Sequence, residues 1–183
     1  MGGIIAMVLA GMRPAALAGA VLNDVGPSLA PEGLARIASH AGKTPRPTDW
    51  DEAAEAARAI NGLAFPHYTA SDWRAFARRL FVEDGEGRPR WAYDPQIVAP
   101  LREAGPAALA PDLTPLFLAL ATGRPMLLVH GALSDLIDAP RVAKMRLMAP
   151  HMAVAEVPGV GHAPMLDEPE ARAALERFMD EAP

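Results

Sequence analysis

Two short stretches of the sequence place an ionisable side chain just after the end of a predicted strand. In LLVHGALSDLI, Asp135 follows an apolar run by a few residues, and in VPGVGHAPML, His162 lies in a loop rich in glycine and proline. A carboxylate beside a histidine fixes the tautomer of the imidazole and stabilises the imidazolium that forms when the ring takes a proton. Asp135 and His162 are therefore our candidate acid and base of a nucleophilic triad.

The segments around these two residues alternate between strand and helix patterns. Strands joined by helices form parallel sheets with right-handed crossovers, so the pattern predicts an α/β fold with a parallel sheet of about three strands flanked by helices. Sites in such sheets are built at the carboxyl edge, where Asp135 and His162 would meet. The predicted strands cover residues 18–22, 125–131 and 152–159, and the helices of this part cover 3–12, 137–148 and 168–179.

A long stretch between the first and second predicted strands breaks this alternation. It predicts helices over 32–40, 50–61, 71–81 and 114–121, joined by segments such as GKTPRPTD and DGEGRPR. We expect an inserted helical cap subdomain over 28–115, with the α/β core formed by 1–27 and 116–183. All three Trp and both Tyr lie in this insertion. They are expected to form its own small core, and the alternative is that a few of them line an apolar ligand pocket.

Composition argues against several kinds of partner. The formal charge of −5 comes with no basic stripe, which argues against nucleic-acid binding. The sequence has no cysteine, which rules out disulfides and thiolate chemistry and fits a cytoplasmic location. Scattered histidines without a metal-ligand spacing, and glycines without a phosphate-binding spacing, predict no metal and no cofactor. Arg13 and Pro14 interrupt the first apolar run, so we expect neither a secretion signal nor a membrane partner.

The stretches GALSD and GHAPMLDEPE resemble the C-terminal half of an α/β-hydrolase, of the kind that includes esterases, enol-lactonases and C–C bond hydrolases. In that family a nucleophilic serine in a GxSxG turn precedes the acid, and the acid precedes the histidine. The resemblance implies a hydrolase for a small apolar ester, lactone or related acyl substrate, with Asp135 orienting His162. Asp24, just past the first predicted strand, is the alternative acid.

The opening MGGIIAM resembles the residues that follow the family's serine. The resemblance implies that the Met1 backbone N–H helps to form the oxyanion hole and that the nucleophile precedes Met1 by one position. We therefore expect a truncated form of the fold that has little activity by itself.

Two alternatives stay open. Ser28, in GPSLA, is the alternative nucleophile, although Pro27 and Pro31 fit the strained turn poorly. The other alternative is a non-catalytic module that binds a small molecule or a protein. In either form, the first predicted strand would leave an exposed apolar sheet edge through which the chain could self-associate.

Overall fold

The computed structural model describes residues 1–40, 45–94 and 112–181. The chain folds into two compact units, one made of Met1–Leu34 with Ala110–Pro183 and the other of Ala35–Leu109. The first unit contains the parallel sheet, and the second contains helices and a hairpin. In the part of the chain that the structure describes, no helix is long and apolar enough to span a membrane.

The division between the units differs from the expected boundaries at 28 and 115. Residues up to Leu34 stay with the sheet unit because they are bonded to it. The Ala30 N–H donates to the Leu136 carbonyl at 2.8 Å. Gly33 packs so closely on the backbone of Asp135 that an added Cβ would lie 2.5 Å from its carbonyl oxygen. The chain therefore leaves the sheet unit several residues later than the loss of the strand pattern suggests.

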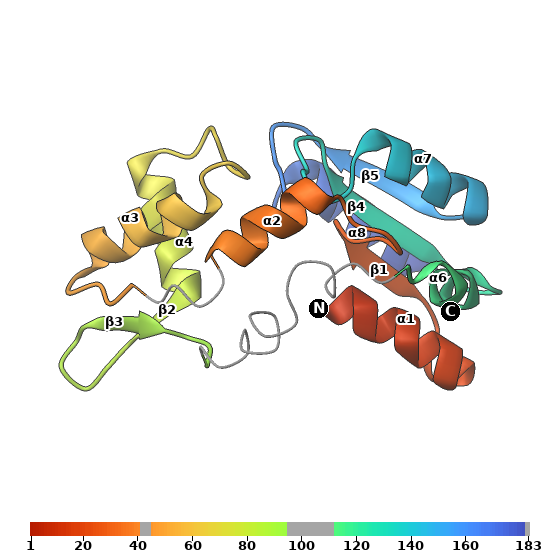
Figure 1. Cartoon of the computed structure of the whole chain (residues 1–183), viewed down its shortest axis with the longest axis horizontal. Coiled ribbons are helices and arrows are strands. Elements are labelled where there is room, and N and C mark those ends of the chain that lie inside the picture. Colours follow the sequence, from red (N-terminus) through yellow and green to blue (C-terminus); the bar gives the residue numbers. More distant parts are fainter. Residues whose placement is uncertain (41–44, 95–111, 182–183) are drawn as a thin grey trace. The chain divides into compact units, whose positions relative to one another are not determined.

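The sheet of the first unit has three parallel strands in the order β1-β4-β5, which confirms the predicted fold class (Figure 1). Each strand is a short apolar run that ends at polar residues or glycine, as expected for strands buried in a parallel sheet. Because β4 is central, all six of its residues are buried. The strands are β1 (Ala20–Asn23), β4 (Met126–Gly131) and β5 (Ala153–Val157).

Helices cover both faces of this sheet. Side chains alternate along a strand, so Met126 and Leu128 face one helix layer while Leu127 and Val129 face the other. The first layer contains α1, α6 and α7, and the second contains α8. The bounds of these helices are Gly2–Met12 for α1, Thr114–Ala121 for α6, Ala139–Met148 for α7 and Pro169–Glu181 for α8, and a short 3₁₀ turn covers Pro14–Ala16.

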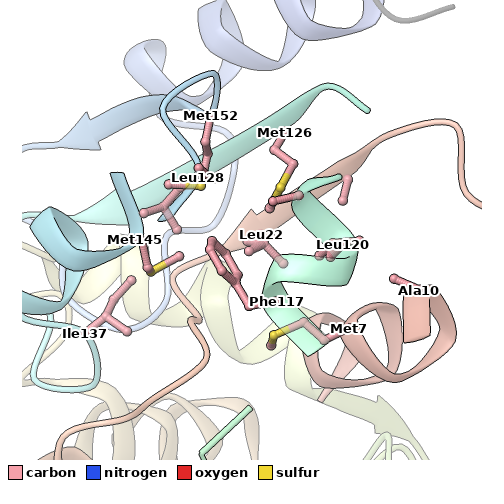
Figure 2. Close-up of a cluster of buried hydrophobic side chains, with 13 residues drawn as sticks. Met7, Ala10, Leu22, Phe117, Leu120, Met126, Leu128, Ile137, Met145 and Met152 are labelled. Atoms are coloured by element: carbon pink, nitrogen blue, oxygen red, sulfur yellow. The ribbon is translucent and has the colours of Figure 1, made fainter. Parts of the chain in front are cut away.

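Phe117 of α6 lies at the centre of the larger apolar core (Figure 2). Its side chain is fully buried, with Met145 and Ile137 on one side in this view and Leu22 and Met7 on the other. A large aromatic side chain here joins β1 to three helices. Phe117 is therefore a large and central contributor to this apolar core.

The second unit confirms the predicted helices and adds a hairpin. Helix α2 (Pro31–His40) leads from the first unit, and α3 (Trp50–Asn61) and α4 (Ala70–Leu80) pack together. Thr69 and Asp72 form a capping box at the start of α4, which fixes where that helix begins. Four aromatic rings in and between these helices contact one another, one pair stacked and the others tilted or edge-to-face, as expected for a small separate core. They belong to Phe65, Tyr68, Trp73 and Phe76.

The segment DGEGRPR was expected to be a simple joint, and this was wrong. It turns between two antiparallel strands, β2 (Phe81–Glu83) and β3 (Pro89–Trp91). The Asp84 carboxylate accepts the backbone N–H groups of Glu86 and Arg88 at 2.9 Å each, and Gly87 takes a φ of 77°. Asp and Gly at these positions are typical of a tight turn. The strands themselves are only three residues long, too short to leave a clear alternating pattern.

Core packing around Phe117 generates the first prediction. Phe117→Ala should lower the free energy of unfolding by about 3–5 kcal/mol, because it removes a fully buried ring and leaves a cavity. The adjacent Leu118 is 43% exposed, so Leu118→Ala should change it by about 0.5 kcal/mol. Urea denaturation of both variants measures the two values. Equal losses would contradict the central place of Phe117 in the core.

Candidate active site

A buried carboxylate, Asp24, collects four hydrogen bonds at the carboxyl edge of the sheet. Asp24 directly follows β1, has no exposed surface and takes a φ of 51°, which aspartate tolerates better than most residues. Its Oδ1 accepts from His130 Nδ1 at 2.9 Å and from the Gly131 N–H at 3.0 Å. Its Oδ2 accepts from Ser134 Oγ at 2.6 Å and lies 2.9 Å from His162 Nδ1.

These hydrogen bonds keep Asp24 ionised. Burial on its own raises the pKa of Asp24, but the hydrogen bonds from His130, His162 and Ser134 outweigh it, and the His162 ring lowers this pKa further when it is protonated. The net pKa lies below the ordinary value of 3.8. An ionised carboxylate can only accept, so each histidine carries a proton on Nδ1. When the His162 ring is neutral, its Nε2 then has a lone pair that can take a proton.

Close packing of two loops brings His162 to this carboxylate. Gly131, at the end of β4, has no room for a side chain, because an added Cβ would lie 2.5 Å from the carbonyl oxygen of Gly161. The N–H of Leu133 also donates to the carbonyl of Val160 at 2.8 Å. These contacts hold the loop after β5 against the loop after β4.

A second tie to the His162 loop comes from β1. The Asn23 side-chain amide donates to the carbonyl of Pro164 at 3.0 Å. Asn23 and Asp24 are adjacent in sequence, so the end of β1 holds the His162 loop at two points, two residues apart. Contacts from the end of β1 therefore help to fix the position of the His162 imidazole.

In the structure, the predicted histidine contacts a different carboxylate from the one expected first. His162 Nδ1 pairs with Asp24, the residue named as the alternative acid, and not with Asp135. In the loop after β4 it is Ser134 whose side chain reaches Asp24, while the backbone carbonyl of Asp135 lies against Gly33. The hydroxyl of Ser134 therefore reaches the buried carboxylate from this loop.

Two residues of this site, His130 and Ser134, were missed in the sequence. His130 lies in a segment predicted to be a buried strand, and Ser134 directly precedes the candidate acid Asp135. The only signal for His130 was a polar side chain in an otherwise apolar run, which is expensive to bury without a partner. That signal shows that a partner is needed, but the sequence alone does not show which residue it is.

Met1 and Ser28 are the remaining predicted residues. Met1 precedes α1, and the start of α1 lies against the chain after β1, since a Cβ on Gly3 would be 2.5 Å from Val25 Cγ1. Ser28 lies in the bend between β1 and α2, which starts at Pro31. No hydrogen bond within the described ranges joins Ser28 to Asp24 or His162.

The second unit has a hollow of its own, of about 550 Å³, between residues 45–48, which precede α3, and the β2-β3 hairpin with the residues after it. Arg46, Arg90, Trp91 and Tyr93 are among the residues that line it. Two of the aromatic residues that we considered for a ligand pocket thus do line a hollow, although arginines make it less apolar than expected. Across residues 1–40, 45–94 and 112–181, no three histidine or acidic side chains are grouped so that they could hold a metal ion.

Comparison with known proteins agrees with this geometry. The model of the Alpha/beta hydrolase family matches residues 1–175. The chain therefore belongs to the alpha/beta hydrolase family. It is 36% identical over 182 residues to the 3-hydroxybutyrate-oligomer hydrolase of Cupriavidus necator, a match that covers 97% of this chain and 62% of that protein. The relative is thus itself a hydrolase.

Solved structures show the same fold. An alpha/beta hydrolase from Novosphingobium aromaticivorans superposes with a TM-score of 0.86 at 40% identity, over 97% of this chain and 62% of that one. The E-2-(acetamidomethylene)succinate hydrolase superposes with a TM-score of 0.72 at 22% identity, over 95% of this chain and 62% of that one. At that identity the likeness is one of fold alone. This chain spans about three fifths of the length of each of these proteins.

The ionised state of Asp24 generates the second prediction. Its folded-state pKa lies below the unfolded value, so the stability it contributes is present above pH about 3.8 and is lost as the pH falls through the lower folded value. At neutral pH, Asp24→Asn should cost about 3–5 kcal/mol, because it leaves donors without a charged acceptor. Urea denaturation across pH 2–7 should show the difference between wild type and variant shrinking only at the acid end.

A direct reading of the carboxyl group avoids any dependence on how well the variant folds. In wild-type protein with ¹³C-labelled aspartate, the Asp24 carboxyl signal should titrate below pH 3.8. A midpoint above that value would contradict the hydrogen-bond pattern described for this carboxylate.

Proposed function

We propose that this chain supplies the acid and base of a hydrolase that cleaves a carboxylic ester, a lactone or a related acyl substrate by a Ser-His-Asp mechanism. His162 is the general base and Asp24 is the acid that orients it. The observation that carries this proposal is the 2.9 Å contact between His162 Nδ1 and the buried, ionised carboxylate of Asp24. Asp135, expected first from the sequence, has no catalytic role in this proposal.

The proposed proton transfers follow from the tautomer of His162. With Nδ1–H held by Asp24, the Nε2 lone pair takes the proton of the serine hydroxyl as its oxygen attacks the substrate carbonyl. Asp24 stabilises the imidazolium that results. His162 Nε2–H then gives the proton to the leaving oxygen, and a water molecule repeats the sequence to release the acid. Backbone N–H groups stabilise the oxyanion, the Met1 N–H among them.

We place the nucleophilic serine one position before Met1 in a longer chain. The start of α1 against Val25 supports this placement, because a residue preceding Met1 would lie near the same end of β1 as Asp24. The length of the relatives is consistent with it, since each continues well beyond the part that this chain matches. The proposed substrates follow the relative's name, so 3-hydroxybutyrate oligomers are the first esters to assay.

The gene tests the placement of the serine, and kinetics test the acid. The DNA directly upstream of the Met1 codon should encode Gly-x-Ser in frame. In the protein translated from that longer frame, Asp24→Asn should lower kcat for ester hydrolysis by about 10³–10⁴-fold, because the imidazole loses its orienting charge. Asp135→Asn is the matched control and should leave kcat nearly unchanged.

Two results would count against this assignment. The first is a stop codon immediately before Met1, which would remove the nucleophile and favour a non-catalytic binding module. The second is a large loss of kcat in Asp135→Asn with none in Asp24→Asn, which would restore the acid expected from the sequence.

The outer edge of β1 generates a further prediction for the 183-residue chain. Among the described strands β1 pairs only with β4, so one side of its backbone has no partner strand. An unpaired apolar edge is a template for pairing with another chain, so we expect the 183-residue chain to self-associate. Sedimentation velocity measures this directly. A single monomeric species at all concentrations would contradict it.

A proline variant tests whether the edge of β1 is responsible. The N–H groups of Ala20 and Asp24 donate towards β4, to Pro125 and Val129. Because backbone direction alternates along a strand, the N–H of Val21 points outward. Val21→Pro removes that donor without removing a bond to β4, and should reduce self-association. Ala20→Pro is the matched control: it breaks a bond within the sheet and should destabilise the fold instead.

A further inference from the structure

We propose that His130 is a positioning residue that holds the Asp24 carboxylate and limits the negative charge that Asp24 offers to His162. This inference rests on the proposed function of Asp24 and His162 as the acid and base. It concerns the hydrogen bonds that the one carboxylate of Asp24 makes with two histidines.

The two histidines bind opposite oxygens of the same carboxylate. His130 Nδ1 lies 2.9 Å from Oδ1, and His162 Nδ1 lies 2.9 Å from Oδ2. His130 is 6% exposed and lies in β4, the central strand, so its ring has little freedom to leave. His162 is partly exposed and lies in a loop. The contact between His130 and Oδ1 is therefore the more rigid of the two, and it orients the carboxylate so that Oδ2 faces His162.

A histidine is a costly choice for this position unless its nitrogen is needed. Met126 and Leu128, which precede His130 on the same side of β4, belong to the apolar core. An apolar residue at position 130 would continue that pattern without a polar group to satisfy. The Nδ1 contact with Asp24 is what distinguishes histidine from such a residue. The hydrogen bond to Asp24, and not packing in the apolar core, therefore explains a histidine at position 130.

Ser134 restrains the other oxygen. Its Oγ accepts the N–H groups of Leu136 and Ile137 at 3.1 and 3.2 Å, so its own proton is directed to Asp24 Oδ2. The carboxylate is therefore held at both oxygens before His162 is considered. Each donor withdraws electron density from Asp24. His162 consequently meets a well-oriented but weakened acceptor.

The charges on the elements around these groups are unevenly distributed. Helices α1 and α6 contain no charged side chain. Asp138 caps α7 and pairs with Arg141 at 2.6 Å, and Glu168 accepts the N–H of Met165 at 2.8 Å. The other titratable or charged groups on the described elements around the site are Asp135 in the loop after β4, Asp167 in the loop after β5, Glu156 in β5, opposite His130, Lys144 and Arg146 in α7, Glu32, Arg36 and His40 in α2, and Glu170, Arg172, Glu176, Arg177, Asp180 and Glu181 in α8.

Three substitutions of His130 separate its hydrogen bond from its volume. His130→Leu removes the donor and keeps a similar size. His130→Asn places an amide N–H near the position of Nδ1 and should restore the contact. His130→Gln has the same amide but carries it one carbon farther out, where it does not meet Oδ1. Asn and Gln therefore form a matched pair, which decides the question even where the Leu variant does not fold.

The first readout is the titration of Asp24 in the 183-residue chain, followed by ¹³C NMR. Loss of a donor makes the carboxylate a stronger base, so its midpoint should move to higher pH in His130→Leu and His130→Gln. In His130→Asn it should stay near that of wild type. This readout needs no activity, so it decides the effect of His130 on Asp24 even where the proposed hydrolase activity is absent.

The second readout is the pH profile of kcat/KM for ester hydrolysis by the longer protein. His130→Leu and His130→Gln should lower kcat about tenfold with little change in KM, and the acid limb should move to higher pH because Asp24 then holds the proton on His162 more strongly. His130→Asn should restore both. If the Asp24 titration and the acid limb of the pH profile are both unchanged in folded His130→Gln, the inference is overturned. Full activity in Asp24→Asn would instead overturn the proposed function.

Discussion

The structure depends on one buried negative charge. The carboxylate of Asp24 is inaccessible to water, and it is stable there because four donors from the loops and strands around it surround its two oxygens. A buried charge that loses its partners costs several kcal/mol, so every segment that supplies a donor is held in place by the same requirement. The end of β1, the end of β4 and the loop after β5 are therefore fixed together.

The parallel sheet makes this arrangement possible. Asp24, His130 and His162 are far apart in sequence, yet each lies at or just beyond the carboxyl end of a strand, and three adjacent parallel strands bring these ends to one edge (Figure 1). The apolar cores on the two faces keep the strands in register. Gly131 then lets the loops after β4 and β5 approach within backbone contact. Membership of the alpha/beta hydrolase family agrees with a site at this edge.

Much of the fold could be predicted from the sequence, because apolar runs and helix patterns record burial directly. The helices over 50–61 and 114–121 were predicted with their observed bounds. The choice of acid could not be predicted in the same way. Asp24 lies between Asn23 and the segment Val25-Gly26-Pro27, so it has the local signature of a turn. Only its backbone φ of 51° and the tertiary contacts turn it inward. Ser134 and Asp135 are neighbours, and one residue of loop geometry decides which of them reaches the site.

The central claim is that Asp24, and not Asp135, holds the imidazole of His162. The most direct test is the proton NMR signal of His162 Nδ1–H in the 183-residue chain, which a hydrogen bond to a carboxylate shifts far downfield and protects from exchange. The account predicts this signal in wild type and in Asp135→Asn, and its loss in a folded Asp24→Asn chain. A signal that survives in Asp24→Asn and disappears in Asp135→Asn would contradict it.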